Sequence, residues 1–141
     1  KATELGVAKI TPIISERTEV KDLNIERAIK IVIEATEQSN QLNIPYIQEP
    51  KKLKNFLDSL NNDVSLFFAD INTEKKIDRK NIGEYKTITV LVGPEGDFSS
   101  AEREMILAKN NTIPFLLSKN ILRTETAVIS ALSLINYFLN L

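Results

Sequence analysis

Three short apolar segments, each followed by a polar loop, constrain the fold of this chain more than any other feature. They are VSLFFAD (64–70), TITVLVG (87–93) and TIPFLL (112–117). Runs of this length that are apolar at consecutive positions are typical of strands buried on both faces. Because helical patterns alternate with these segments, the sequence predicts an α/β domain, with a parallel sheet flanked by helices.

The N-terminal half carries the first helix signals. Gly6 is expected to end a helical turn formed by KATEL, and a β-branched run follows at 7–14. Residues 24–41 have Asn24 at the N-cap and apolar residues at helical spacing. A second helix is expected over 51–60.

The C-terminal half adds a surface connection and two helices. Residues 72–86 contain five basic and three acidic residues, and they read either as a solvated loop or as an RNA-facing patch. Ser99 and Glu102 have the spacing of a capping box, and the last helix is expected to begin near Thr124. A length of 141 residues fits a single domain, 1–141.

The composition removes several classes of chemistry. The chain has no cysteine and no histidine, which excludes disulfides, thiolate nucleophiles, the commonest metal ligand and the usual neutral-pH base. Its formal net charge of −1 gives no overall basic field, so nucleic acid would have to bind a local patch. We therefore expect any enzyme activity to use carboxylates, Lys, Arg, hydroxyls and backbone groups, with no metal.

Neither end of the sequence has the pattern of a membrane or export signal. KATELGVAK lacks an apolar core of the secretory type. The last sixteen residues, TAVISALSLINYFLNL, are uncharged, but they fall short of the roughly 20 apolar residues that a membrane span needs. We expect a cytoplasmic protein with no membrane partner.

Two loops follow expected strands and precede expected helices: GPEGDFSS and SKNILRTE. In open parallel sheets, ligands bind beyond the carboxyl ends of the strands. Gly93 and Gly96 could adopt positive φ and leave room for a ligand against the main chain. Neither a dinucleotide fingerprint nor a phosphate-binding P-loop is present. From the residues alone, a structural turn and a small-molecule loop remain equally plausible.

Four segments, KATELGV, EATEQSNQ, LVGPEGDFSSAE and NILRTETA, occur in the order and spacing of one family. The chain resembles the RsmE family of ribosomal RNA uridine-N3 methyltransferases, members of the SPOUT superfamily. The resemblance implies a C-terminal trefoil knot, S-adenosylmethionine as methyl donor, homodimerisation, and action on a uridine of small-subunit (16S) ribosomal RNA. Methylation at uracil N3 needs no cysteine nucleophile; positioning and electrostatic help from an Arg and a carboxylate suffice.

The resemblance also assigns roles to individual residues. It implies catalytic roles for Arg123 and Glu125, and RNA contacts for Arg17, Gln38 and Asn40. The implied cofactor-binding residues are Phe68, Ala69, Val92, Gly93, Pro94, Glu95, Gly96, Leu117, Ser118, Ile121, Leu122, Arg123, Thr126 and Ala127. Several residues have a structural alternative. Thr124 and Thr126 could be helix-capping residues, and Glu125 could favour the positive end of the helix dipole. Arg17 could be a solvated side chain, and 38–40 a plain helix end.

The sequence departs from the family pattern in several places. Asp97 and Ser118 stand where the family usually has glycine, and Gln41 and Asn120 stand where it has arginine. The chain also starts after the RNA-binding barrel and the first catalytic strand that the family carries. The expected alternative is therefore a SPOUT-type dimeric scaffold, or a decayed fragment, with weak or no cofactor binding. The residues do not identify the uridine, the catalytic base, or whether another chain supplies the missing region.

The final helix predicts an interface. Its polar side, which includes Ser130, Ser133, Asn136 and Tyr137, carries no charge, whereas a freely solvated helix face normally carries Lys or Glu. We expect a two-fold dimer that covers this side. Burial of the helix within a single chain is the alternative.

Overall fold

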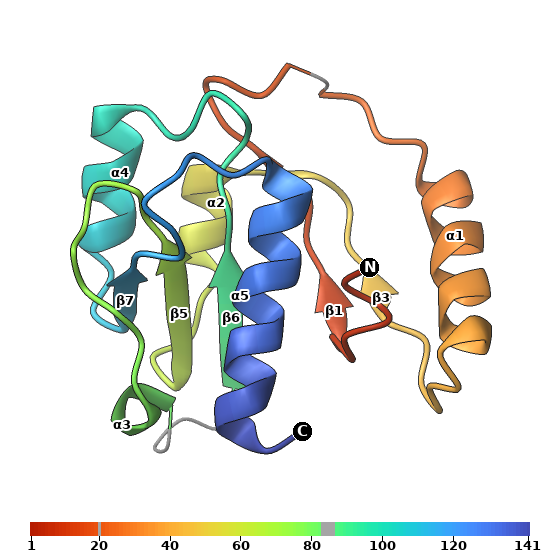
Figure 1. The fold of residues 1–141 in the computed structure, drawn as a ribbon. Helices are drawn as coiled ribbons and strands as arrows, with labels where there is room; N and C mark the ends of the chain where they lie inside the picture. The colour runs from red at the N-terminus through yellow and green to blue at the C-terminus, as the bar shows by residue number, and fades with distance from the viewer. Residues whose placement is uncertain (20, 83–86) are drawn as a thin grey trace.

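The computed structural model describes residues 1–19, 21–82 and 87–141. In the described residues, short strands and helices alternate along the chain (Figure 1). The elements are β1 (Lys9–Ile10), β2 (Ile13–Ile14), α1 (Ile25–Gln38), β3 (Tyr46–Ile47), β4 (Lys51–Lys52), α2 (Leu53–Asp58), β5 (Val64–Ala69), α3 (Arg79–Ile82), β6 (Thr87–Leu91), α4 (Ser100–Leu107), β7 (Thr112–Phe115) and α5 (Thr124–Leu139).

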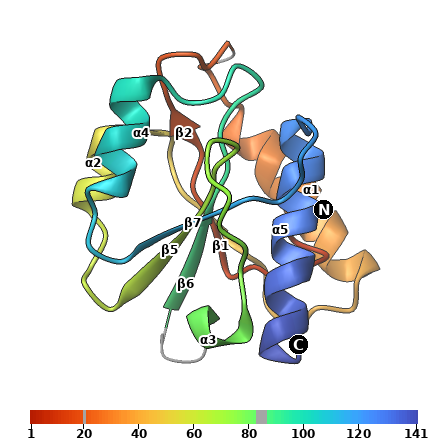
Figure 2. The same ribbon diagram turned by 60° about the vertical axis from the view of Figure 1, so that its left-hand side comes forward.

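The principal sheet contains the three apolar segments in the order β6-β5-β7, and all of its pairings are parallel. Its central strand β5 is buried on both faces, since residues 65–68 are all buried. Helices α2 and α4 cover one face, and α3 and α5 cover the other (Figures 1 and 2). The predicted fold class, a parallel α/β sheet flanked by helices, is confirmed.

Two aromatic-rich clusters hold these layers together. On the first face, Leu66 and Phe68 of β5 pack with Leu57 of α2 and Ile106 of α4. On the second face, Phe67 of the same strand joins the cluster that contains Phe115, Ala131 and Ile135. Alternate side chains of one strand therefore bind opposite helix layers, as the pleat of a strand dictates.

The N-terminal half adds two short parallel pairings, β1 with β3 and β2 with β4. The predicted second helix begins later than expected, because Lys51–Lys52 pair with Ile13–Ile14 as strand before α2 starts. The first helix is confirmed, with the Asn24 side chain accepting a hydrogen bond from the backbone N–H of Arg27.

Gly6 ends the N-terminal turn as predicted. Its φ is +79°, the left-handed conformation that favours glycine. The N–H of Gly6 donates to the Thr3 carbonyl at 2.9 Å, and the N–H of Val7 donates to the Ala2 carbonyl at 3.4 Å. This pair of bonds is a Schellman motif.

Helix α5 packs on the sheet through Ala131 and Ile135. Its uncharged Asn136 donates to the Leu5 carbonyl oxygen at 2.8 Å. One of the uncharged polar residues expected to need a partner chain thus has its partner within this chain. Along the described residues, no helix is both long and apolar enough to cross a membrane.

The connection after β5 is partly described. It contains the one-turn helix α3, whose Ile82 is buried in the second cluster. Residues 83–86 of the predicted surface connection lie outside the described residues. Neither of its two readings is tested.

Candidate functional site

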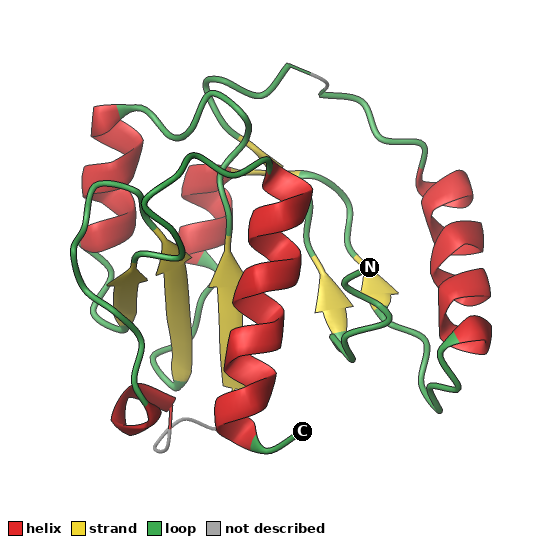
Figure 3. Cartoon of the chain, in the orientation of Figure 1, coloured by secondary structure: helices red, strands yellow, loops and turns green. Residues whose placement is uncertain are grey.

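A cavity of about 410 Å³ lies at the carboxyl ends of β5, β6 and β7. Three loops surround it, and Figure 3 shows them as the green segments beyond the arrowheads. Its volume is within the range of small-molecule sites. The lining residues are Arg17, Ala69, Asp70, Ile71, Asn72, Val92, Gly93, Pro94, Glu95, Gly96, Asp97, Phe98, Ser100, Leu117, Ser118, Asn120, Ile121, Leu122, Thr124 and Ala127.

The first wall is the turn at 92–97, which follows the last paired residue of β6. The N–H of Asp97 donates to the Pro94 carbonyl at 2.8 Å and closes the turn. Asp97 has φ +60°, and its carboxylate accepts the N–H of Phe98 at 2.8 Å. The left-handed residue of this turn is therefore Asp97, the position where the resemblance leads one to expect glycine.

The two glycines of this turn differ from the prediction in their backbone conformation. Neither Gly93 nor Gly96 has positive φ, so that expectation is wrong. A Cβ on Gly93 would meet Asp97 Oδ1 at 3.1 Å and the Phe98 ring at 3.3 Å. A Cβ on Gly96 would meet the Arg17 Cβ at 3.3 Å. Both positions leave space for neighbouring protein atoms.

The second wall is the loop at 117–122, which runs into α5. The hydroxyl of Thr124, the first residue of α5, donates to the Gly93 carbonyl at 3.1 Å. The Ser118 hydroxyl accepts the N–H of Asn120 at 3.0 Å, whereas Ile121 is 82% exposed at the edge of the cavity. The Thr124 contact joins the two loops that the sequence singled out.

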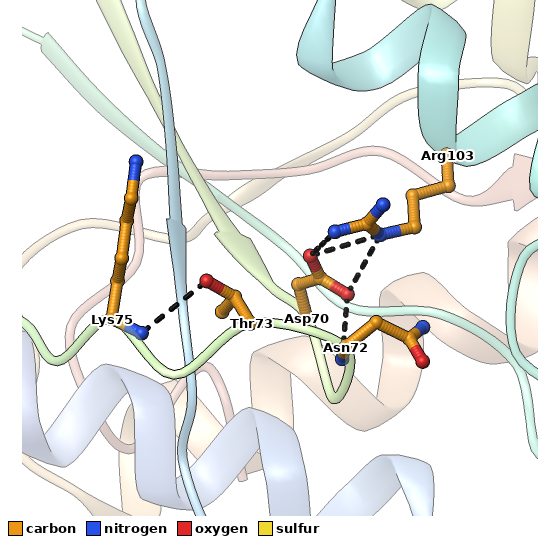
Figure 4. A network of polar contacts seen from close by, with 5 residues as sticks. All are labelled: Asp70, Asn72, Thr73, Lys75 and Arg103. Carbon is orange, nitrogen blue, oxygen red and sulfur yellow. Dashed lines mark hydrogen bonds and ion pairs between the residues drawn. The ribbon is translucent and has the colours of Figure 1, made fainter.

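The third wall is the segment at 69–72, beyond β5. The buried Asp70 carboxylate accepts two donors of Arg103, with Nε at 3.1 Å and Nη2 at 2.9 Å from Oδ2 (Figure 4). It also accepts the N–H of Asn72 at 3.0 Å. The hydrogen bond with Asp70 raises the pKa of the Arg103 guanidinium above its ordinary value. A charged, bidentate pair therefore anchors this wall to α4.

Most of the predicted cofactor-binding residues come together at this cavity. Phe68 does not line it: its side chain is buried in the first core cluster, edge-to-face with Phe98, with the two ring centroids 5.8 Å apart. Arg123 and Thr126 are exposed and also lie outside the lining set. The predicted residues that do line it are Ala69, Val92, Gly93, Pro94, Glu95, Gly96, Leu117, Ser118, Ile121, Leu122 and Ala127.

The other predicted residues divide into two places. Arg17, predicted to contact RNA, lines the cavity and donates from Nη1 to the Gly96 carbonyl at 2.8 Å. Glu125 is exposed in the first turn of α5, next to Arg123 at its N-cap. Gln38 and Asn40 are exposed at the end of α1, outside the lining set.

Several residues at the site were not singled out from the sequence. Asp70 and Asn72 line the cavity, and Arg103 pairs with Asp70 from outside the lining set. Asp70 could have been noticed as a carboxylate placed directly after a strand buried on both faces. Its partner Arg103 is 33 positions away, and no local pattern reveals the pair.

The charges at the cavity suit an organic ligand with both signs. Among the described lining residues, Glu95 and Asp97 supply carboxylates and Arg17 supplies a cation. Val92, Leu117 and Leu122 supply apolar wall. The described residues contain no cluster of three or more potential metal ligands. The arrangement can bind a ligand that has an apolar part and both positive and negative groups.

Comparison with known proteins gives a consistent result. A model of the RNA methyltransferase domain matches residues 1–136. Proteins named ribosomal RNA small subunit methyltransferase E are similar to this chain. The one from Rickettsia conorii is 38% identical over 134 residues, covering 94% of this chain and 54% of the relative. The one from Aquifex aeolicus is 38% identical over 143 residues, covering 98% and 60%.

A solved structure is similar as well. The crystal structure of a ribosomal RNA small subunit methyltransferase E from Neisseria gonorrhoeae, bound to S-adenosyl methionine, matches with a TM-score of 0.88 and 31% identity. The match covers 96% of this chain and 57% of that one. The chain thus spans little more than half the length of the relatives it matches.

Proposed function

The chain belongs to the RNA methyltransferase domain family, and on that premise we propose that it transfers a methyl group from S-adenosylmethionine to N3 of a uridine in small-subunit ribosomal RNA. The recognition of an RsmE-like domain in the sequence is confirmed by the relatives. One observation carries the proposal. The loops at 92–97 and 117–122 join through Thr124 and Gly93 into one cavity at the strand ends, where ligands of parallel sheets bind.

The residues of the cavity fit this methyl donor. S-adenosylmethionine supplies an electrophilic methyl group on a sulfonium, and it carries an ammonium, a carboxylate and an adenosine. Leu117, Leu122 and Val92 offer apolar contact to the adenine. The Glu95 carboxylate offers an acceptor for positive groups, and Arg17 offers donors for the carboxylate.

The RNA side of the reaction is assigned to the rim. Uracil N3 must lose its imide proton before it can accept a methyl group, and the uracil then carries negative charge. Arg123 and Glu125 are exposed where the second loop enters α5. We assign stabilisation of the negative charge on the uracil to Arg123 and acceptance of the imide proton to the Glu125 carboxylate. Gln38 and Asn40, exposed at the end of α1, remain proposed RNA contacts.

Three further features belong to the same proposal: a C-terminal trefoil knot, a cytoplasmic location and a homodimer. The knot is proposed from the family resemblance. A cytoplasmic location fits a protein that acts on ribosomal RNA. The dimer is supported by apolar side chains that α5 leaves partly uncovered: Ile129 at 37%, Tyr137 at 77% and Leu139 at 36% exposure.

Dimerisation through α5 predicts that a charge on its exposed side will separate the subunits. Ser133 is exposed there, and Ser133→Glu should raise the dimer dissociation constant at least ten-fold, because the carboxylate would lose water on burial. Sedimentation velocity measures it. A monomeric parent at micromolar concentration, with its fold intact, would contradict the dimer.

Methyl transfer is tested by nucleoside analysis. Incubation of the chain with S-adenosylmethionine and small-subunit RNA should yield 3-methyluridine in the RNA digest. The yield should be low at physiological salt and higher at low salt, because a net charge of −1 gives little counterion release. Chromatography with mass detection identifies the modified nucleoside.

Variants at Arg123 sharpen this assay. Arg123→Lys keeps the charge but loses the planar fork, so the initial rate should fall about ten-fold or more. Arg27→Lys, on α1, is the matched control and should leave the rate unchanged. No 3-methyluridine at low salt, or a different methylated nucleoside, would contradict the proposed reaction.

A further inference from the structure

Glu102 and Arg103 are adjacent in the first turn of α4, and neither lines the cavity. Glu102 nevertheless contacts the turn at 15–18, which carries the lining residue Arg17. Arg103 contacts Asp70 in the lining segment at 69–72. The two side chains contact different walls of the cavity: Glu102 contacts Ser99 and Glu16, and Arg103 contacts Asp70.

Glu102 connects α4 to the turn at 15–18. Its side chain is buried, with 6% of the residue exposed. One carboxylate oxygen accepts the N–H of Ser99 at 3.0 Å and completes the capping box. The other accepts the N–H of Glu16 at 2.9 Å, across 86 positions of sequence. A buried carboxylate with two backbone donors is a strong anchor.

The turn at 15–18 connects Glu102 to the cavity wall. The Thr18 hydroxyl accepts the N–H of Ser15 at 2.9 Å and shares a second bond of 2.9 Å with the Ser15 hydroxyl, so the turn is internally cross-linked. Arg17 then donates to the Gly96 carbonyl, and its stem lies 3.3 Å from the place where a Gly96 Cβ would stand. The wall at 92–97 therefore depends on Glu102 from both of its sides: through Ser99 along the chain and through Arg17 across it.

Arg103 holds the wall at 69–72. Its bidentate pair with the buried Asp70 holds the segment at 69–72. Further along the same segment, the Lys75 carbonyl accepts the N–H of Leu116 at 2.8 Å, directly before the loop at 117–122. Figure 4 shows Asp70 between Arg103 and Asn72, with Lys75 further along the same ribbon.

We infer that Glu102 and Arg103 are positioning residues that hold the cavity in its binding-competent shape before the methyl donor arrives. Glu102 sets the wall at 92–97, and Arg103 sets the wall at 69–72 and, through Lys75, the start of the second loop. A preformed site binds more tightly because the free energy of binding then includes no entropy cost for ordering its walls. The inference rests on the proposed function, which supplies S-adenosylmethionine as the ligand.

Two conservative variants test this role. Glu102→Gln keeps the side-chain volume, and glutamine still suits a capping box, but its amide leaves one of the two backbone donors without an acceptor. Arg103→Met keeps most of the stem and removes the ion pair. Each should weaken S-adenosylmethionine binding about five- to ten-fold in calorimetry at a temperature where the variants are folded. Amide hydrogen exchange should accelerate at 15–18 for the first variant and at 69–72 for the second.

Controls separate positioning from a loss of general stability. Glu104→Gln makes the first change at an exposed position of α4 and should alter neither readout. Ile106→Val removes a methylene from the fully buried core residue of the same helix; it should lower the melting temperature and leave the affinity unchanged. Should Arg103→Met not fold, Arg103→Lys keeps the charge without the fork and should weaken binding about two- to three-fold.

Unchanged affinity and unchanged exchange in Glu102→Gln and in the folded Arg103 variant would overturn the inference. It would equally be overturned if Ile106→Val weakened binding as much as they do. A parent chain that does not bind S-adenosylmethionine would instead contradict the proposed function. In that case the amide hydrogen exchange rates at 15–18 and 69–72 still decide whether Glu102 and Arg103 order the walls of the cavity.

Discussion

Replacement of Leu66 by alanine is expected to lower the free energy of unfolding by about 3 kcal/mol. Leu66 lies in the central strand β5 with 1% of its surface exposed, packed in the cluster that includes Leu57 of α2 and Ile106 of α4. Truncation leaves a cavity between the sheet and both helices of that face. Urea denaturation, with the transition midpoint and slope fitted together, measures the loss.

Leu42 offers the same chemical change at the other extreme of burial, since it is 97% exposed. Leu42→Ala should change the free energy of unfolding by no more than about 0.5 kcal/mol. Equal losses in the two variants would show that β5 does not lie between two helix layers in solution.

Gly93→Ala is expected to weaken S-adenosylmethionine binding about ten-fold or more. The added Cβ would stand 3.1 Å from Asp97 Oδ1 and 3.3 Å from the ring of Phe98, and Phe98 is 6% exposed in the core. Because neither neighbour can move freely, the turn at 92–97 must shift, at a cost of about 1–3 kcal/mol. The Gly93 carbonyl that accepts the Thr124 hydroxyl would shift with it.

Gly96→Ala is the matched variant in the same turn. Its Cβ would meet only the exposed side chain of Arg17, with Cβ at 3.3 Å and Cδ at 3.4 Å, and no core ring, so the loss of affinity should be smaller, about two- to three-fold. The order of the two effects is the informative result. A larger effect at Gly96 than at Gly93 would contradict this account of the turn, and would indicate that the ligand lies against Gly96.

The principal sheet was predictable because its strands carry their own signal. Residues 65–68 of β5 are apolar or small at every position and are buried on both faces, and a short run of this kind is typical of a strand inside a parallel sheet. Local hydrogen bonds were equally predictable, because the Ser99–Glu102 capping box and the Asn24 cap each join residues that are three positions apart. The two-residue strands were not, since Lys51–Lys52 become strand only by pairing with Ile13–Ile14.

The loops of the candidate site were predicted from the sequence, but the long-range contacts that hold them together were not. The loops at 92–97 and 117–122 were located from the strand ends and the family resemblance, and the cavity joins them. The contacts that hold them are long-range: Arg17 reaches Gly96 across 79 positions, and Arg103 reaches Asp70 across 33. The backbone conformation of the turn was also predicted wrongly. The sequence suggested positive φ at Gly93 and Gly96, whereas Asp97 is the residue that adopts it.

The central claim is that the cavity at the strand ends is a methyl-donor site, and a titration of the ¹⁵N-labelled chain with S-adenosylmethionine, followed by two-dimensional NMR, tests it most directly. We expect saturable shifts of backbone amides at 92–97 and 117–122, two loops that line the cavity, with one ligand bound per chain. Amides at the end of α1, near Gln38, should stay unchanged. No shifts at millimolar ligand, or shifts confined to segments outside the three cavity walls, would contradict it.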